Sequence, residues 1–194
     1  MNSTALYEAL NQLSPITEEA WNDFEPLFQP LALKKNEYLV REGSRVHKAY
    51  FQLEGVIRVF YNKEGNEYNK TFFIPGTFPT PLTALLSESA SAISFQALTD
   101  AKVLAFSYPG FKELFVKHRC LETLLLRILE QVWIKKERHD IRMVTNDATT
   151  NYLHFREDFP NLENQIPQYH IASYLGITPI QLSRIRAQLV KSSG

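Results

Sequence analysis

The chain has 194 residues, of which 44% are hydrophobic and 22% are charged, and its 21 Lys and Arg balance its 21 Asp and Glu. This composition is typical of a globular protein that buries a core, and it excludes a strongly basic or acidic chain. The single cysteine, Cys120, excludes an intramolecular disulfide and favours a reducing compartment. No apolar run approaches the roughly 18 residues of a membrane span, and the N-terminus lacks a signal segment, so we expect a cytoplasmic protein.

The N-terminal part of the chain changes from a helical to a β pattern near Leu31. Residues 4–28 place apolar side chains at helical spacing, with a helix start at Ser14–Glu18. From Leu31 to Phe106, short β-branched and aromatic runs alternate with turn signals. A two-residue Glu-Gly loop between Tyr50–Leu53 and Val56–Tyr61 predicts a β-hairpin. With further strands at Tyr68–Ile74, Phe95–Ala97 and Val103–Ser107, the pattern indicates an antiparallel β jelly roll within an α+β fold.

After Ser107 the pattern becomes helical, and its main feature is a long segment at Leu121–Val144. This segment carries a stripe of Leu121, Leu125, Ile128 and Val132 together with apolar residues on other faces. A helix with apolar residues on several faces must pack against its own β-domain on one side and against another partner on the opposite side. The economical partner is a second copy of the chain, so we expect the stripe at a homodimer interface; burial wholly within the monomer is the alternative. Shorter helices are expected at Pro109–Lys117 and, after a cap at Thr145–Asp147, at Ala148–Phe159.

The C-terminal stretch Ile166–Gln188 is typical of two short helices around a tight turn. Gly176 suits the left-handed residue that ends a helix, and Thr178 then begins a Thr-x-x-Gln capping box with Pro179 at the first helical position. From Ile166 to Gly194 the cations are Arg184, Arg186 and Lys191, and there is no Asp or Glu. The pattern predicts a DNA-binding helix-turn-helix, and an αα-corner in a helical core is the alternative.

Three motifs follow one another along the chain: F-x-L-x-G-x-x-R-V at Phe51–Val59, F-x-x-G-x-F at Phe73–Phe78, and I-A-x-x-L-G-I-T-x-x-x-L-S-R at Ile171–Arg184. Together they resemble the CRP/FNR-type transcription regulators, in which a cyclic-nucleotide-binding-like domain precedes a DNA-binding domain. The resemblance covers nearly the whole chain. It implies an effector-type β-roll domain with N-terminal helices at 1–118, a long dimerisation helix at 119–145 and a helix-turn-helix domain at 146–194. It also implies a homodimer, palindromic DNA half-sites and contact with RNA polymerase.

The second helix of the C-terminal pair is then the one expected in the major groove. Arg184 matches the base-reading arginine of the family, and arginine pairs bidentately with guanine. We expect Gln181 to pair with adenine and Ile180 to touch a thymine methyl group, while the remaining expected contacts are to phosphates, from Thr178, Ser183, Gln168 and Tyr169. Arg186 points about 200° away around the helix and is expected at the DNA backbone or in solvent. Because no strand pattern follows the second helix before Gly194, we expect any winged character to come from strands before Ile166 or to be absent.

The expected ligand pocket departs from the family at two points. Members that bind a cyclic nucleotide carry a Glu for the ribose hydroxyl and later an Arg for the cyclic phosphate. In this chain Thr80 falls about where the Glu should be, and no Arg or Lys occurs from Thr71 to Ala101. A buried phosphate without a cation loses its charge-assisted hydrogen bonds, so cyclic AMP or GMP is not expected in the usual manner. The pocket either holds an unknown, less charged effector or is plain core, and its expected lining is Phe72, Phe78, Thr80, Ser91 and Phe95.

No cofactor is expected. One cysteine cannot ligate an iron–sulfur cluster that needs about four thiolates. The five histidines are scattered without the spacing of a haem or metal site, and His118-x-Cys120 is expected to be a surface imidazole beside a surface thiol. No nucleophile–base or glycine-rich phosphate motif is visible, so we predict no enzyme.

The sequence therefore predicts a cytoplasmic, homodimeric DNA-binding transcription regulator whose effector, operator and direction of regulation it does not name. The alternative is a β-roll module that binds a ligand or a protein partner and carries a vestigial helix-turn-helix tail that does not bind DNA.

Overall fold

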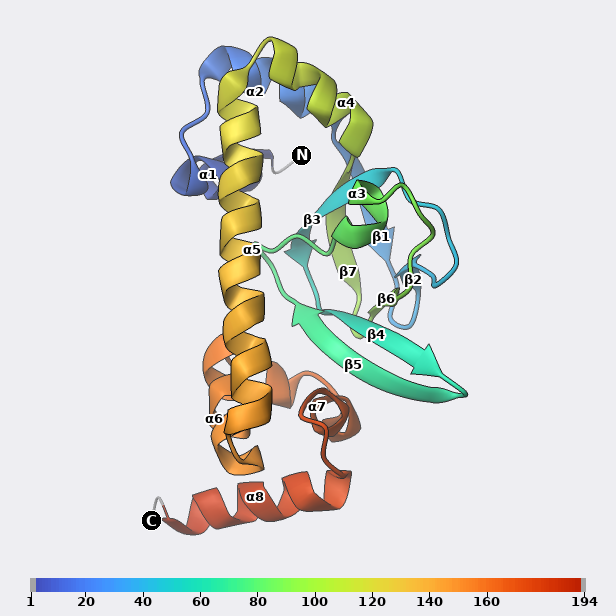
Figure 1. Ribbon diagram of the computed structural model, residues 1–194, viewed down its shortest axis with the longest axis vertical. Helices are drawn as coiled ribbons and strands as arrows, with labels where there is room; N and C mark the ends of the chain where they lie inside the picture. The colour runs from blue at the N-terminus through green and yellow to red at the C-terminus, as the bar shows by residue number, and fades with distance from the viewer. Residues whose placement is uncertain (1–2, 193–194) are drawn as a thin grey trace.

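The computed structural model describes residues 3–192. The extreme ends of the first and third predicted domains, residues 1–2 and 193–194, lie outside the described residues. The long helix α5 (Arg119–Thr145) stands along one side of two β-sheets and joins helices at one end of the molecule to helices at the other (Figure 1). The strands are β1 (Gln29–Leu33), β2 (Tyr38–Val40), β3 (Lys48–Glu54), β4 (Ile57–Lys63), β5 (Asn66–Phe73), β6 (Ser94–Ala97) and β7 (Ala101–Ser107). The other helices are α1 (Ser3–Leu13), α2 (Glu18–Phe24), α3 (Leu82–Leu86), α4 (Tyr108–Glu113), α6 (Ala148–Asp158), α7 (Gln168–Tyr174) and α8 (Pro179–Ser192).

The strands form a sheet of order β1-β7-β3 and a sheet of order β2-β6-β4-β5, and all the paired neighbours are antiparallel. Inward side chains of both sheets pack together in one core, which includes Ile57, Val59, Phe95 and Val103. This pair of sheets, called the β-roll below, confirms the predicted antiparallel jelly roll in an α+β fold.

The predicted hairpin across Glu54–Gly55 is wrong. β3 pairs with β7 and β4 pairs with β5 and β6, so Glu54–Gly55 carries the chain from one sheet to the other. The hairpin instead joins β4 to β5 through Glu64–Gly65, whose positive φ values of 54° and 85° suit the tight turn between paired Lys63 and Asn66. A two-residue turn signal fixes a reversal of the chain, but it does not fix which strands then pair.

Two further cores attach helices to the outer faces of the sheets. The first packs α1, α2, α4 and the start of α5 against β3 and β7. The second packs α6, α7 and α8 against Val56, Phe72 and Leu98 on the other sheet. Two of the expected caps are present: Thr17 Oγ1 accepts from Ala20 N at 3.2 Å, and Asp147 Oδ1 accepts from Thr150 N at 2.8 Å.

Gly55 lies where the two corners that link the sheets touch. Its φ is +83°, and a Cβ atom there would lie 2.2 Å from the backbone oxygen of Asp100. We predict that Gly55→Ala lowers the free energy of unfolding by more than about 2 kcal/mol, because neither the backbone conformation nor the contact can be relieved cheaply.

Gly65→Ala is the matched control, because Gly65 has a φ of +85° and nothing within 4 Å of the added atom. It should cost only about 1 kcal/mol of backbone strain. Urea unfolding of the two variants checks the prediction, and equal losses would contradict it.

Candidate functional site

The C-terminal helix pair, α7 and α8, has the predicted turn. Gly176 takes a φ of +66°, and the amide of Ile177 donates to the oxygen of Ala172 at 3.0 Å. The hydroxyl of Thr178 accepts from the amide of Gln181 at 3.2 Å, so Thr178 is the N-cap of α8 as expected.

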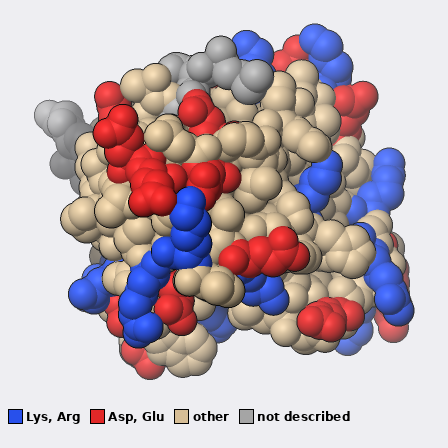
Figure 2. All heavy atoms as spheres, turned by 90° about the horizontal axis from the view of Figure 1, so that it is seen from above, with Lys and Arg blue, Asp and Glu red and all other residues tan. Residues whose placement is uncertain are grey.

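The outer face of α8 is exposed and carries no acid. Leu182 and Ile185 are buried against α6 and α7, while Ile180, Arg184 and Lys191 lie about 180° away around the helix and are exposed. On the face at the other end of the molecule, which Figure 2 shows from above, acidic and basic side chains are interspersed. The outer ridge of α8, formed by Ile180, Arg184 and Lys191, thus offers positive charge and hydrogen-bond donors on a helix that carries no carboxylate of its own.

The residues expected to touch DNA are placed as follows. Those on the turn and α8 are exposed: Thr178, Ile180, Gln181, Ser183 and Arg184. On α7, Tyr169 is 56% exposed, with its ring centroid 4.1 Å from that of His170. Gln168 is half-buried and its amide donates to the oxygen of Glu163 at 3.0 Å, so this side chain holds the preceding turn instead of reaching outward.

Arg186 is neither at the outer ridge nor simply solvated, which corrects the expectation for it. Its Nε lies 3.9 Å from a carboxylate oxygen of Glu163, which also pairs with Arg156 at 3.1 Å and accepts a hydrogen bond from the Tyr152 hydroxyl. Burial and the nearby Glu163 raise the pKa of Tyr152 to about 12. Arg186 is therefore directed toward the turn that follows α6, where Glu163 lies.

The five residues expected to line a ligand pocket do not converge. Phe72 points out of the β-roll and packs on Phe155, Phe159 and Tyr174. Phe95 is buried in the β-roll core, whereas Phe78 packs on Phe51 beneath the N-terminal helices.

The two polar members of the expected pocket are already engaged by backbone. The Thr80 hydroxyl accepts from the amide of Tyr50 at 2.9 Å, and the Ser91 hydroxyl donates to the oxygen of Ile93 at 2.7 Å. Because both hydroxyls are engaged by backbone, these residues do not form a ready-made polar site.

The expected dimer stripe faces into the molecule, which corrects the prediction. Leu121 is fully buried, and Leu125 and Ile128 pack against the same core beside α1 and α2. Val132 lies on this side too but is 50% exposed, beyond the end of that core. The spacing of the stripe identifies a face of α5 that is covered. It does not identify the N-terminal helices that cover this face, because their position could not be predicted from the sequence.

A second apolar face of α5 is uncovered. Leu126, Trp133 and Val144 follow one line within about 20° of each other around the helix, opposite Ile128, and are 54%, 65% and 84% exposed. Ile134 and Ile141 flank this line. This set is called the open face of α5.

A buried polar cluster between the β-roll and α7 was not predicted from the sequence. Arg58 is 4% exposed; its guanidinium lies 2.6 Å from Glu67 and 3.4 Å from Nδ1 of His170, and donates to Gln96 at 2.6 and 2.9 Å. Asn69 donates to the oxygen of His170 at 3.0 Å. Because Ile57 and Val59 face inward, alternation predicts an outward Arg58, but only the docking of α7 buries it.

Burial, and then the nearby Arg58, lower the pKa of His170 from 6.5 to about 4. His170 is 4% exposed and is therefore neutral at physiological pH. Nδ1 faces two donor groups, Arg58 and Asn69 at 3.4 and 3.2 Å, so it is the accepting nitrogen and the proton lies on Nε2.

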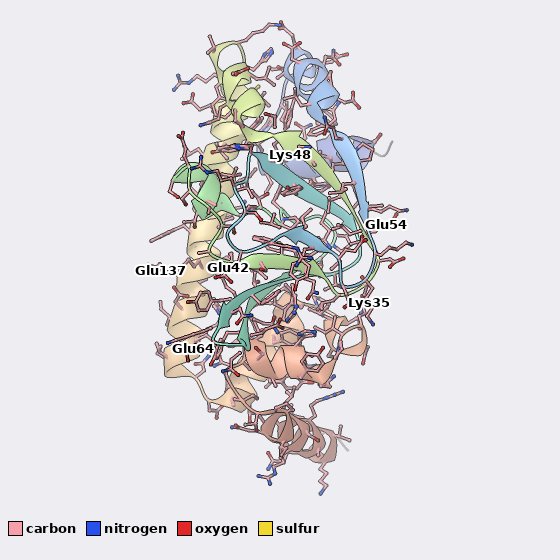
Figure 3. All side chains as sticks on the ribbon, turned by 90° about the vertical axis from the view of Figure 1, so that its right-hand side faces the viewer. Lys35, Glu42, Lys48, Glu54, Glu64 and Glu137 are labelled. Carbon is pink, nitrogen blue, oxygen red and sulfur yellow. The ribbon has the colours of Figure 1, made fainter. Side chains whose placement is uncertain are left out.

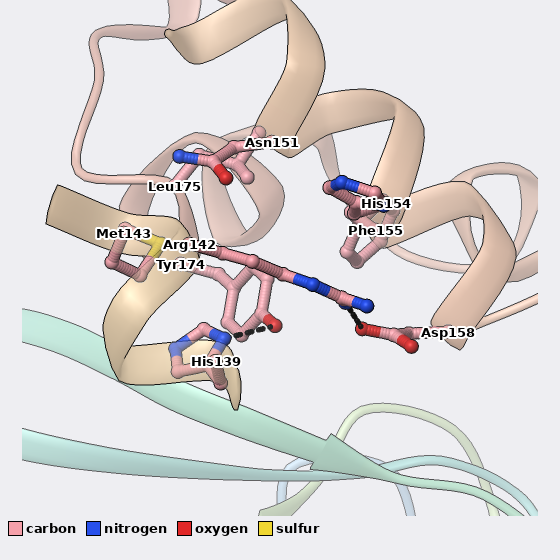
Figure 4. Close-up of a pocket in the computed structure, with 9 residues that line it drawn as sticks. All are labelled: His139, Arg142, Met143, Asn151, His154, Phe155, Asp158, Tyr174 and Leu175. Atoms are coloured by element: carbon pink, nitrogen blue, oxygen red, sulfur yellow. Dashed lines mark hydrogen bonds and ion pairs between the residues drawn. The ribbon is translucent and has the colours of Figure 1, made fainter. Parts of the chain in front are cut away.

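A small cavity lies where α5, α6 and α7 meet (Figure 4). Its volume of about 10 Å³ suits a single water molecule. The Tyr174 hydroxyl lies 3.2 Å from Nδ1 of His139, and Arg142 pairs with Asp158 at 3.2 Å. Burial lowers the pKa of His139, so this contact too is made by a neutral imidazole.

An open groove of about 430 Å³ runs between the start of β5 and the turn of the helix pair. Its lining includes Asn66, Tyr68, Ser173, Thr178 and Gln181. Figure 3 shows Glu64 at the tip of the same β4–β5 hairpin, near the level of the C-terminal helices. Two expected contact residues, Thr178 and Gln181, thus share a surface with the β-roll.

Within the described residues no group of three or more His, Cys, Asp or Glu side chains is arranged to hold a metal ion. His118 differs from the expected surface imidazole: it is 5% exposed and its Nε2 lies 2.7 Å from Asp23, whose pKa is lowered chiefly by the hydrogen bond with His118. None of the described helices is long and apolar enough to cross a membrane.

The structure is thus a β-roll joined by one long helix to a C-terminal helix pair with an exposed, acid-free outer ridge. Residues 30–118 match the family model of the cyclic nucleotide-binding domain. A search of curated proteins by sequence found no match. The chain has the fold of the CRP/FNR-type transcription regulators, and the resemblance predicted from its motifs is confirmed.

Three solved structures carry that conclusion. FixK2 from Bradyrhizobium japonicum is 17% identical, with 86% of each chain covered and a TM-score of 0.72. A CooA mutant from Carboxydothermus hydrogenoformans is 18% identical over 91% of this chain and 87% of its own, with a TM-score of 0.69. The regulator CLP of Xanthomonas campestris is 15% identical over 91% and 93%, with a TM-score of 0.66.

Proposed function

We propose that the chain is a DNA-binding transcription regulator that acts as a homodimer. The outer ridge of α8 is the observation that carries the proposal, because Ile180, Arg184 and Lys191 are exposed on a stretch without a single acidic residue. Such a helix offers donors to base edges and cations to phosphates, whereas an ordinary solvated face mixes Glu with Lys.

Arg184 is the proposed base reader. It lies at the centre of the outer ridge and has no ion pair within residues 3–192, so its guanidinium is available for a bidentate contact. Gln181 and Ile180 flank it toward the start of α8, the end that enters the major groove in proteins of this motif. Thr178, Ser183 and Tyr169 remain the proposed phosphate contacts, and Gln168 is withdrawn from that set because its amide is engaged with Glu163.

The open face of α5 is the proposed dimer contact. Leu126, Trp133 and Val144 expose apolar surface along one line of a long helix, and a second α5 packed parallel to the first along this line would cover it. Around the helix, Glu130 and Glu137 lie between this line and Ile134 and Ile141, so the contact would run along the line itself, with the two carboxylates at its margin. The dimer would bring two copies of α8 together, which suits a palindromic operator.

The proposed effector is not a cyclic nucleotide bound in the usual manner. Thr80 is held by the backbone of Tyr50, and the buried cation closest in sequence, Arg58, faces α7 instead of the β-roll interior. CLP is described as responsive to cyclic di-GMP, so the fold itself accepts different signals. As the resemblance implies, the regulator would work in the cytoplasm and contact RNA polymerase, without a catalytic step or cofactor.

Arg184→Ala should weaken binding to the preferred palindrome by about 1–3 kcal/mol relative to random duplex, because the variant loses the guanine contact. Arg184→Lys is the matched control, since it keeps the charge but cannot form the bidentate pair. Gel shifts with an operator selected from a random duplex library measure the ratio of specific to non-specific affinity. An unchanged ratio in Arg184→Ala would refute the role of Arg184, and salt-independent or absent binding in the wild type would favour a β-roll module that does not bind DNA.

Trp133→Asp should weaken the dimer by roughly 2–4 kcal/mol, because each copy would place a charge in the apolar contact. Sedimentation equilibrium measures the change. Val116→Asp is the control, since Val116 is 96% exposed but lies outside α5. A dimer that survives Trp133→Asp unchanged would place the interface elsewhere.

Calorimetry with cyclic AMP and with cyclic GMP should give no heat of binding, because no Arg or Lys occurs from Thr71 to Ala101, where the family places the cation for the cyclic phosphate. A saturable signal at micromolar concentration would contradict this account of the effector.

A further inference from the structure

The C-terminal helix pair is held by the β-roll itself as well as by α5. Asn69 on the edge strand β5 donates from its backbone amide to the Ser173 hydroxyl at 3.0 Å, and that hydroxyl donates to the oxygen of Glu67 at 3.0 Å. Asn69 also donates to the oxygen of His170. α7 therefore satisfies backbone groups at an edge that would otherwise be open.

The positive charge at this contact is buried, and a partly exposed carboxylate balances it. Arg58 on β4 is paired with Glu67 on β5 and lies over the ring of Phe60 at 3.9 Å. The same guanidinium reaches Nδ1 of His170 on α7 at 3.4 Å. Next to this polar part, Phe72 packs on aromatic side chains of α6 and α7, which adds an apolar contact beside the buried guanidinium.

We propose that Arg58, Asn69 and His170 form a proton-released latch, in which neutral His170 holds the C-terminal helix pair against β5 and its protonation frees the pair. These three are positioning residues: none lies on the outer ridge of α8, and they set how α8 is presented. The consequence for DNA rests on the proposed function, whereas the latch itself does not.

Protonation is incompatible with the docked geometry. A proton on Nδ1 would face the donor groups of Arg58 and Asn69 and place a second positive charge 3.4 Å from the guanidinium. The charged groups that face His170 are Arg58 from β4, which lowers its pKa, and Glu67 from β5, which raises it. Glu67 is already paired with Arg58, so it offsets the guanidinium only in part.

The docked and released states of the helix pair bind a proton at His170 with different pKa values, and this difference sets the direction of the pH effect. Released His170 binds a proton near its ordinary pKa of 6.5, whereas docked His170 does so only near 4. The released state therefore holds more protons between these values and gains population as the pH falls through that window. The equilibrium for release should rise about thirtyfold between pH 7.5 and pH 5.

Hydrogen exchange of the full chain at pH 7.5 and pH 5, corrected for intrinsic exchange rates, tests the latch without DNA. Exchange in peptides covering α7 and β5 should rise about thirtyfold at pH 5, while β3 and β7 in the other sheet keep their protection. In His170→Gln this pH response should disappear.

His139→Gln is the matched control, because His139 contacts Tyr174 on the same helix from the side of α5 and its pKa is also lowered by burial. This variant should keep the response at β5. A second variant, Asn69→Ala, tests the latch even if the helix pair of His170→Gln does not dock on β5. It keeps His170 and removes the hydrogen bonds from the Asn69 side chain, so exchange of α7 and β5 should already be raised at pH 7.5.

Two results would overturn the latch. One is a pH response in His170→Gln equal to that of the wild type. The other is simultaneous loss of protection in β3 and β7, which would mean global unfolding. DNA binding at the two pH values is a separate arm: a pH-dependent affinity that His170→Gln abolishes supports positioning of α8 by the latch, whereas absence of DNA binding at both values refutes the proposed function and leaves the exchange result to decide the latch.

Discussion

A buried guanidinium is the constraint on which the arrangement of the two halves depends. Arg58 lies on the outer side of β4, where α7 covers it. Its guanidinium can be removed from water only because Glu67, Gln96 and Asn69 accept its hydrogen bonds. Covering it brings His170 into contact and carries α8 to a fixed place. The long helix α5 sets how far apart the halves are, but this cluster sets how they are turned.

Much of the local structure could be predicted because local chemistry decides it. Thr178, Asp147 and Thr17 cap helices where a hydroxyl or carboxylate precedes a helical pattern, and Gly176 takes the left-handed conformation that ends α7. Alternating side chains likewise predicted strands close to those observed. The exposed residues of α8 followed from its 3.6-residue period once Leu182 and Ile185 were assigned to the core.

The incorrect predictions share one physical cause. The spacing of apolar residues shows which face of an element is buried, but it does not show which other element covers that face. The stripe from Leu121 to Ile128 is buried as expected, yet by α1 and α2 of the same chain. Phe72 is core, but core with α6 and α7 instead of a ligand wall. Glu54–Gly55 is a tight turn, yet it changes sheets. In each case the observed arrangement depends on a contact between residues that are far apart in the sequence.

The contact between Arg186 and Glu163 changes the electrostatics of α8. The sequence from Ile166 to Gly194 carries three cations, but one of them, Arg186, is directed toward Glu163 of the preceding turn, a carboxylate that it shares with Arg156. Counterion release counts only charges that reach phosphate. Each subunit would then displace about two ions from DNA through α8 instead of three, which leaves recognition more dependent on hydrogen bonds to bases and less on bulk attraction to the backbone.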